Sequence, residues 1–174
     1  MAIHIALLRA INVGGRIVKM DALRGYCDAL GFAKVETFIA SGNVIFESRG
    51  GAPALEKKLE AHLREVLGYD VATFVRSAAE LDAAVSRAES RLRGKEGAHV
   101  GFLKAPVGAE EQTKIAAFEH ADERFEFDGR EIYWFTRSGI GQSKFNNQVF
   151  ERIITSPSTF RNITTVRKLA DKYA

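Results

Sequence analysis

Cysteine is almost absent from this sequence, since Cys27 is the only one in 174 residues. A single cysteine excludes a disulfide bond within the chain and favours a reducing compartment. Long hydrophobic runs are missing as well, and the first residues show neither a basic leader nor a cleavage site. These absences predict a cytoplasmic protein that has no membrane partner.

The common signatures of cofactor and metal sites are also missing. Gly14 and Gly15 fit neither the G-x-G-x-x-G nor the G-x-x-x-x-G-K-[ST] pattern, which argues against dinucleotide and P-loop binding. No nucleophile stands beside an evident base. The four histidines are scattered, without the i,i+4 spacing of a helical metal site: His4, His62, His99 and His120. We therefore expect no cofactor and no metal site.

The composition is that of an ordinary globular protein, with 46% hydrophobic and 27% charged residues. The net charge of +3 is unevenly distributed. Residues 137–174 contain seven Lys and Arg against two Asp and Glu, a net charge of +5 that leaves −2 on the rest. A basic C-terminal segment suggests an anionic partner, although a solvated helical face would have the same composition.

The first half of the sequence alternates strand and helix patterns. Residues 3–9 form a strand with apolar residues on both faces, and residues 20–30 form a helix whose apolar stripe includes Cys27 as a small core residue. A hairpin at 34–48, a helix at 53–67 and a strand at 71–76 follow. This β-α-β-β-α-β order predicts an α/β, ferredoxin-like unit.

The second half restarts this pattern and then departs from it. A capping box at Ser77–Glu80 opens a third helix, and the best candidate boundary between two domains, 1–92 and 98–174, is the stretch from Arg93 to Gly97. A strand at 100–104, a helix at 109–118 and a hairpin turning at Asp128-Gly129 give a related β-α-β-β half. It ends in two helices that begin near Ser143 and Asn162. Five carboxylates cluster around the hairpin, and alternation is expected to put some of them on the solvent face of an edge strand: Asp122, Glu123, Glu126, Asp128 and Glu131.

Five strings occur in order along the chain: "LLRAINVGGR", "KMDALRGYCDALGF", "ASGNVIFES", "IYWFTRSGIGQSKF" and "STFRNITTVRKL". With them the sequence resembles the domain-of-unknown-function family 1697 (DUF1697). The resemblance implies a small bacterial cytoplasmic protein with an α/β, ferredoxin-like core and no established activity. The sequence departs from the family pattern at Ala10, Arg137 and Ile163, where Gly, Pro and Trp are more usual.

The loop after the first strand is the first candidate for ligand contact. Its glycines let backbone approach a ligand closely, and clustered N–H groups can hold an anion. Alternatively, the loop has only a structural role, as a tight connection between the first strand and the first helix. The hairpin turn Ser41-Gly42-Asn43 is expected at the opposite end of the adjacent strands, away from this loop. The candidate binding residues of the loop are Arg9, Asn12, Gly14, Gly15 and Arg16.

The starts of the last two helices are the second candidate. Ser143 and Asn162 read as N-caps, with Lys144 just inside one helix and Arg161 just outside the other. Free N–H groups and the helix dipole favour an anion there, so a cation at both starts suggests that an anion is recruited. Alternatively, the two residues only cap, and the cations reach solvent or pair with a carboxylate. Asn147 completes this group of candidate ligand-binding residues.

Three hypotheses follow. The first is binding of a phosphate-bearing or other anionic ligand, a nucleotide or nucleic acid, in a polar cleft between the two halves. The second is an enzyme acting on a small anionic substrate, with Lys144 or Arg161 stabilising charge and Asn12 or Ser143 orienting a group. The third is a structural or self-association module. The oligomeric state is left open.

Overall fold

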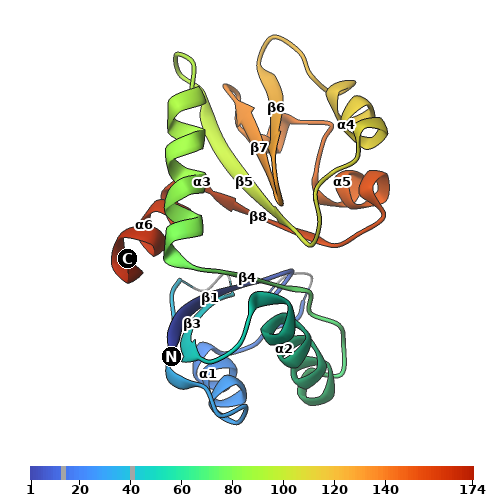
Figure 1. The fold of residues 1–174 in the computed structure, drawn as a ribbon. Coiled ribbons are helices and arrows are strands. Elements are labelled where there is room, and N and C mark those ends of the chain that lie inside the picture. The colour runs from blue at the N-terminus through green and yellow to red at the C-terminus, as the bar shows by residue number, and fades with distance from the viewer. Residues whose placement is uncertain (13–14, 40–41) are drawn as a thin grey trace. The chain divides into compact units, whose positions relative to one another are not determined.

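The computed structural model describes residues 1–12, 15–39 and 42–174. The chain forms two compact units: unit 1 comprises residues 1–80 and 173–174, and unit 2 comprises residues 81–172 (Figure 1). Within the described ranges, no helix is both long and apolar enough to cross a bilayer.

Unit 1 has the order predicted from its sequence. It contains one four-stranded antiparallel sheet, ordered β2-β3-β1-β4, against which α1 and α2 pack. The α/β class and the β-α-β-β-α-β order of this half are confirmed. The elements are β1 (Ala2–Leu8), α1 (Met20–Asp28), β2 (Ala33–Thr37), β3 (Asn43–Ser48), α2 (Ala52–Leu67) and β4 (Thr73–Arg76).

The local signals act in unit 1 as their chemistry suggests. Leu23 and Cys27 of α1 are buried in a core that α2 shares, and Gly68 ends α2 in the left-handed conformation, with φ 78°. Burial raises the pKa of the Cys27 thiol to about 12. A thiol with so high a pKa is not a nucleophile near neutral pH, which agrees with a core role.

Unit 2 is a second four-stranded antiparallel sheet, ordered β6-β7-β5-β8. The Ser77–Glu80 capping box that precedes it is confirmed, because Glu80 N donates to Ser77 Oγ (3.1 Å) and Ser77 N donates to Glu80 Oε2 (2.8 Å). The elements are α3 (Ala78–Arg91), β5 (Gly97–Leu103), α4 (Ala109–Ala116), β6 (Glu123–Asp128), β7 (Glu131–Thr136), η1 (Ile140–Gln142), α5 (Asn147–Ile154), β8 (Ser158–Asn162) and α6 (Ile163–Tyr173).

A strand that the sequence did not indicate, β8, lies between the two C-terminal helices. It reads Ser-Thr-Phe-Arg-Asn, with one apolar residue and therefore no apolar alternation to mark it. Pairing with β5 makes it a strand. The second half therefore does not pass from helix to helix but completes the β-α-β-β-α-β order of the first.

The two units also share their strand register. Arg76 pairs with Ile5 in unit 1, and Arg161 pairs with Val100 at the corresponding position of unit 2. A second correspondence lies at the start of the last strand, where a helix carboxylate accepts a backbone N–H. In unit 1 Thr73 N donates to Glu60 Oε1 (2.9 Å), and in unit 2 Ser158 N donates to Glu151 Oε1 (2.8 Å). Such a repeat of topology, register and contact is what an internal duplication would leave.

An aromatic cluster fills one face of the unit 2 sheet beneath α4 and α5. Trp134 packs edge-on against Phe145, with ring centroids 5.0 Å apart, and Phe150 contacts Phe145 in the same manner at 5.7 Å. Edge-to-face contacts of this kind stabilise a core beyond the area that they bury. This cluster holds β6, β7 and the segment leading into α5 together.

His99 on β5 and Trp134 on β7 are cross-strand neighbours on the same face of the sheet, with ring centroids 6.1 Å apart. Its Nδ1 is buried and has no hydrogen-bond partner in the part of the chain that the structure describes. Burial lowers the pKa of His99 from its ordinary value of 6.5. Below that value the unfolded chain therefore binds more protons at this site than the folded chain.

Because of this difference, we expect His99 to lower the free energy of unfolding as the pH drops below 6.5. The loss is complete once the pH is below the pKa of His99 in the folded protein. In the variant His99→Phe, the slope of this free energy against pH should be shallower in the same window. Urea titrations at a series of pH values measure both slopes. Equal slopes in the two proteins would contradict the assignment.

Candidate functional site

The candidate binding residues from the sequence divide between the units. Unit 1 carries those of the loop after β1, of which Gly14 lies outside the described residues. Unit 2 carries those around the last two helices. The cleft predicted between the two halves stays a prediction.

The loop after β1, residues 9–12 and 15–19, has an unusual backbone. Ala10 has φ 52° and Asn12 has φ 57°, whereas Ile11 between them is not in the left-handed region. Gly15 has φ 81°. Left-handed conformations cost free energy at residues other than glycine, and such positions cluster at functional sites. Alternation of this kind turns successive N–H groups toward one side and forms an anion-binding concavity called a nest.

The side chain of Asn12 closes this loop through a hydrogen bond, although the residue is exposed. Its Oδ1 accepts a hydrogen bond from Val18 N (2.5 Å), across six residues. Val18 is buried, and α1 begins two residues later. Asn12 therefore holds the loop in its curved form, which is a positioning role.

The β2–β3 hairpin lies beside this loop, contrary to the prediction that the two are at opposite ends. Leu8 N donates to Gly42 O (2.8 Å), and a Cβ built on Gly42 would lie 2.3 Å from Ile11 Cγ2. The reason is the antiparallel β1–β3 pairing, which sets the last residues of β1 next to the first residue of β3. The turn residues Ala40 and Ser41 lie outside the described residues.

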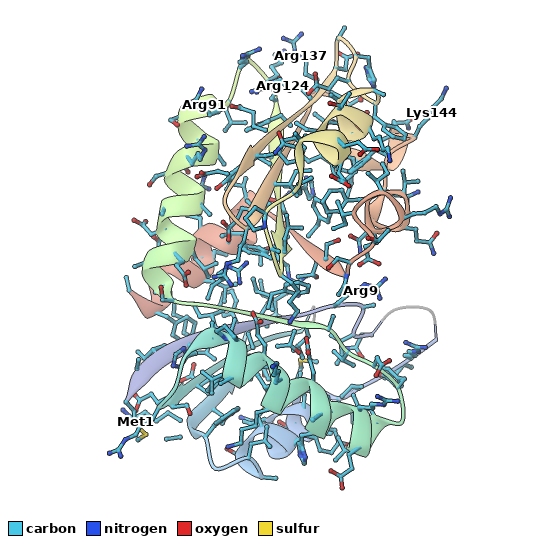
Figure 2. The ribbon with its side chains drawn as sticks, turned by 45° about the vertical axis from the view of Figure 1, so that its right-hand side comes forward. Met1, Arg9, Arg91, Arg124, Arg137 and Lys144 are labelled. Carbon is cyan, nitrogen blue, oxygen red and sulfur yellow. The ribbon has the colours of Figure 1, made fainter. Side chains whose placement is uncertain are left out.

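The loop is cationic. Its sequence from Arg9 to Lys19 contains three basic residues and no acidic residue. Arg16 is exposed and lies over the ring of Tyr69, with its guanidinium carbon 4.2 Å from the centroid. Stacking of this kind orients the guanidinium without neutralising it. In the described structure neither Arg16 nor the exposed Lys19 forms an ion pair, and Arg9 is half-buried at the end of β1 (Figure 2).

Some backbone N–H groups of the loop form hydrogen bonds within the described residues, and others do not. Arg9 N donates to Ala72 O (2.9 Å) and Val18 N donates to Asn12. In contrast, the N–H groups of Ala10 and Ile11 make no hydrogen bond within residues 1–12, 15–39 and 42–174. Backbone polar groups in folded proteins are nearly always paired with protein, water or ligand. These two consecutive donors, in a backbone of alternating φ sign, are suited to an anion.

In unit 2, Ser143 is not the N-cap that the sequence suggested. The helix α5 begins at Asn147, and Asn146 is its cap, since Asn146 Oδ1 accepts from Val149 N (2.9 Å). Lys144 therefore precedes the helix instead of lying in its first turn. The prediction failed because Asn146 offers the same capping chemistry three residues further along.

Arg161 lies just before the cap of α6, as predicted, but it is a buried strand residue and not a cation exposed at the helix start. It lies within β8, is 8% exposed, and donates through Nη1 to Thr159 Oγ1 (2.7 Å) and Phe160 O (3.0 Å). Desolvation lowers the pKa of its guanidinium to about 10. Asn162 does cap α6 as predicted, because its Oδ1 accepts from Thr164 N (2.9 Å). The start of α6 therefore has its cap but no exposed cation in front of it.

Asn147 has a structural function between α5 and β8. Its Oδ1 accepts from Ser158 Oγ (2.6 Å), and its amide lies within reach of Ser158 O (3.4 Å). Lys144 lines a cavity with Glu123 at the start of β6, whereas Arg161 lies on β8, and β6 and β8 are the opposite edges of the four-stranded sheet. The predicted residues of unit 2 therefore do not gather into one site.

The sequence missed the residue that organises this part of the molecule, Glu123. Its carboxylate is buried, 4% exposed, and so does not share the solvated face that was expected for some of the hairpin carboxylates. Oε1 accepts hydrogen bonds from Trp134 Nε1 (2.6 Å) and from Ser143 Oγ, and Oε2 lies 3.1 Å from His120 Nε2. A signal was present, because a buried indole N–H requires an acceptor and the hairpin register pairs Trp134 with Phe125, diagonally from Glu123.

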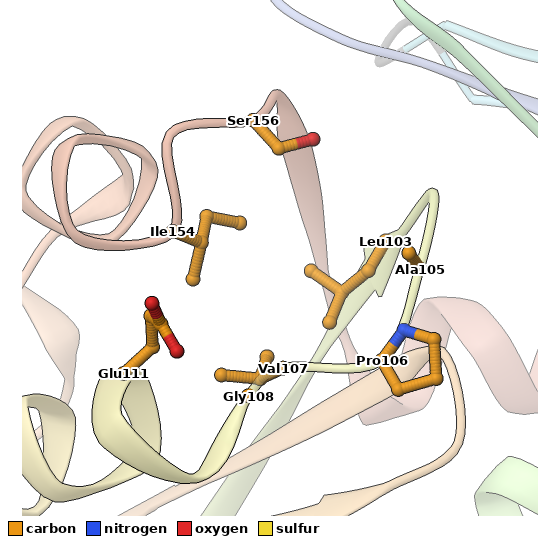
Figure 3. A pocket seen from close by; sticks show the side chains of 8 residues that line it. All are labelled: Leu103, Ala105, Pro106, Val107, Gly108, Glu111, Ile154 and Ser156. Atoms are coloured by element: carbon orange, nitrogen blue, oxygen red, sulfur yellow. The ribbon is translucent and has the colours of Figure 1, made fainter.

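Two cavities flank the unit 2 sheet. One, of about 240 Å³, lies between the β5–α4 loop and the end of α5; Figure 3 shows the Glu111 carboxylate at its wall, next to Ile154 and across from Leu103. The other, of about 440 Å³, lies beside Glu123 at the end of α4. Across the described positions, no three His, Cys, Asp or Glu residues gather closely enough to hold a metal ion.

The two sheets define a small α/β protein built from two units of the same strand order. The family model described as "Protein of unknown function (DUF1697)" matches residues 1–133, and the chain belongs to this family. Among solved structures, it is similar to the conserved bacterial protein SP0830 from Streptococcus pneumoniae, with a TM-score of 0.77 and 24% identity. That match covers 99% of this chain and 98% of the other, and it shows the fold alone. No curated protein matches the sequence.

Proposed function

We infer that the protein binds a phosphate-bearing ligand at the loop after β1 in unit 1. The observation that carries this proposal is the pair of N–H groups at Ala10 and Ile11, which make no hydrogen bond within the described residues and belong to a backbone of alternating φ sign. The same loop carries the exposed cation of Arg16. Convergent N–H groups and a guanidinium are the usual protein partners of a phosphate oxygen. The loop needs no large movement to present them, because the Asn12 hydrogen bond to Val18 already curves it.

The ligand that fits best is a small phosphate ester such as a nucleotide. Tyr69 orients the Arg16 guanidinium, so two of its N–H groups can donate to two phosphate oxygens at once. A longer nucleic acid would require further cations along the backbone and would show a steep salt dependence. The salt slope therefore separates a single phosphate group from an oligonucleotide.

Replacing Arg16 by glutamine should weaken binding of adenosine monophosphate about tenfold, since a charge-assisted hydrogen bond contributes roughly 1.5–3 kcal/mol. Lys19→Gln should weaken it less, because Lys19 is a mobile point charge at the rim. Lys57→Gln is the matched control, an exposed lysine on α2 away from the loop. Calorimetric titrations with inorganic phosphate, adenosine monophosphate and a single-stranded oligonucleotide measure these affinities. Absence of binding by all three, or equal affinities of the Arg16 and Lys57 variants, would overturn the proposal.

The enzyme and self-association hypotheses stay predictions. For the first, the hydroxyl of Ser143 donates to the Glu123 carboxylate and not to a histidine, so it lacks the usual general base of a nucleophilic serine. For the second, sedimentation at several protein concentrations measures whether the chain remains a monomer.

A further inference from the structure

The cavity beside Glu123 has the properties of a second binding site, in unit 2. It measures about 440 Å³, within the usual range of small-molecule pockets. We call it the Glu123 pocket. Its walls come from the end of α4, the start of β6 and the segment after η1, and it is lined by Ala117, Phe118, Glu119, His120, Glu123, Gln142 and Lys144.

The pocket offers one cation and one amide, those of Lys144 and Gln142. Lys144 is exposed and projects from the surface of unit 2 (Figure 2). Neither its ammonium nor the amide of Gln142 has a hydrogen bond or ion pair in the described part of the chain. A carboxylate or another compact anion would satisfy both groups at this rim.

The pocket also contains two carboxylates that hydrogen bonds hold in place. The Glu123 carboxylate is held by Trp134, Ser143 and His120, and Oε2 has room for one more hydrogen-bond donor. Glu119 is fixed as well, because its Oε1 accepts from Phe125 N (3.1 Å). Two oriented carboxylates favour an ammonium group over a neutral one.

An apolar wall completes the pocket. Phe118 stands edge-on to Phe145, with ring centroids 5.5 Å apart, and Ala117 lies next to it at the end of α4. This wall suits a hydrocarbon side chain.

We propose that the Glu123 pocket binds a free α-amino acid. The amino acid carboxylate lies against Lys144 and Gln142, the ammonium against Glu119 and Glu123, and the side chain against Phe118. This site is independent of the phosphate site proposed above, because it lies in the other unit and uses none of the same residues.

The sole tryptophan reports on this pocket directly. Trp134 is the only one in the chain, and its indole N–H donates to Glu123 Oε1 at 2.6 Å. An ammonium that approaches Glu123 withdraws charge from the carboxylate and thereby weakens this hydrogen bond. Occupation of the pocket should therefore shift the indole N–H resonance and change the tryptophan fluorescence.

The test titrates the full chain with the twenty protein amino acids in pools and follows the Trp134 indole resonance by heteronuclear NMR. At least one pool should produce a saturable shift, and resolving that pool should identify apolar amino acids of modest size. The matching carboxylic acid without the amine, and the amine without the carboxylate, should each bind at least tenfold more weakly. A pool series without any saturable indole shift would overturn the proposal.

Variants separate a built site from weak surface association. Lys144→Gln should weaken the identified amino acid about tenfold and leave the indole position of the free protein nearly unchanged, since Lys144 is exposed. Lys168→Gln, an exposed lysine on α6, is the matched control and should bind like the parent chain. Equal weakening by both substitutions, or a carboxylic acid that binds as well as the amino acid, would also overturn the proposal.

Discussion

Replacing Glu123 by leucine should lower the free energy of unfolding of unit 2 by about 3 kcal/mol. The leucine fills a similar volume but accepts no hydrogen bond. It leaves the buried indole N–H of Trp134 without an acceptor and releases Ser143 and His120, which can turn toward water. An orphaned buried donor costs more than the hydrogen bond itself contributes, so most of the loss comes from Trp134.

Two further variants give this prediction its contrast. Glu123→Gln retains one acceptor oxygen for Trp134 and Ser143, and we expect a loss of about 1 kcal/mol. Glu110→Gln removes an exposed carboxylate paired with Lys114 on α4 and should cost almost nothing. Urea unfolding, followed by Trp134 fluorescence, measures the free energy of unfolding of the three variants. A leucine variant as stable as the glutamine variant would show that Glu123 does not hold the indole.

Replacing Gly42 by alanine should destabilise unit 1 by about 2–4 kcal/mol, the sum of overpacking and of a left-handed backbone. The new Cβ would lie 2.3 Å from Ile11 Cγ2 and 3.1 Å from Leu8 Cβ. Because Gly42 also has φ 79°, the residue can relieve the contact only by leaving the conformation that bonds its carbonyl to Leu8 N. The hairpin and the loop should then separate.

Gly68→Ala is the matched control for this effect. Gly68 has nearly the same φ, 78°, but a Cβ there would meet nothing within 4 Å. We expect a loss of about 1 kcal/mol, the conformational part alone. Thermal unfolding by circular dichroism compares the two variants, and hydrogen exchange of the Leu8 amide reports locally on the contact. Equal losses at Gly42 and Gly68 would show that the contact with Ile11 relaxes without cost.

The Gly42 variant also bears on the proposed phosphate site. A displaced Ile11 would disturb the alternating backbone of residues 10–12, so phosphate binding should weaken together with stability. Arg16→Gln, in contrast, should weaken binding without loss of stability, because the side chain is exposed. The two variants thus separate the shape of the loop from its charge.

The sequence by itself determined the elements whose signals are local. The apolar stripe of α1, the left-handed Gly68 after α2 and the Ser77–Glu80 capping box each involve residues within one or two turns of one another. Their energetics are contained in a short window, and so the pattern is readable without knowledge of the fold. The β-α-β-β-α-β order of unit 1 followed from such windows taken in series.

Only the tertiary structure decided the features that depend on distant partners. β8 is a strand because β5 offers it an edge, and its own five residues carry no alternating pattern. Glu123 is buried because Trp134, which the hairpin register pairs with Phe125 and so places diagonally from Glu123, supplies a donor that compensates its desolvation. The loop after β1 meets the hairpin because antiparallel pairing joins strand ends far apart in the chain. In each case the stabilising contact spans a long sequence separation, and the folded chain must pair its strands before that contact exists.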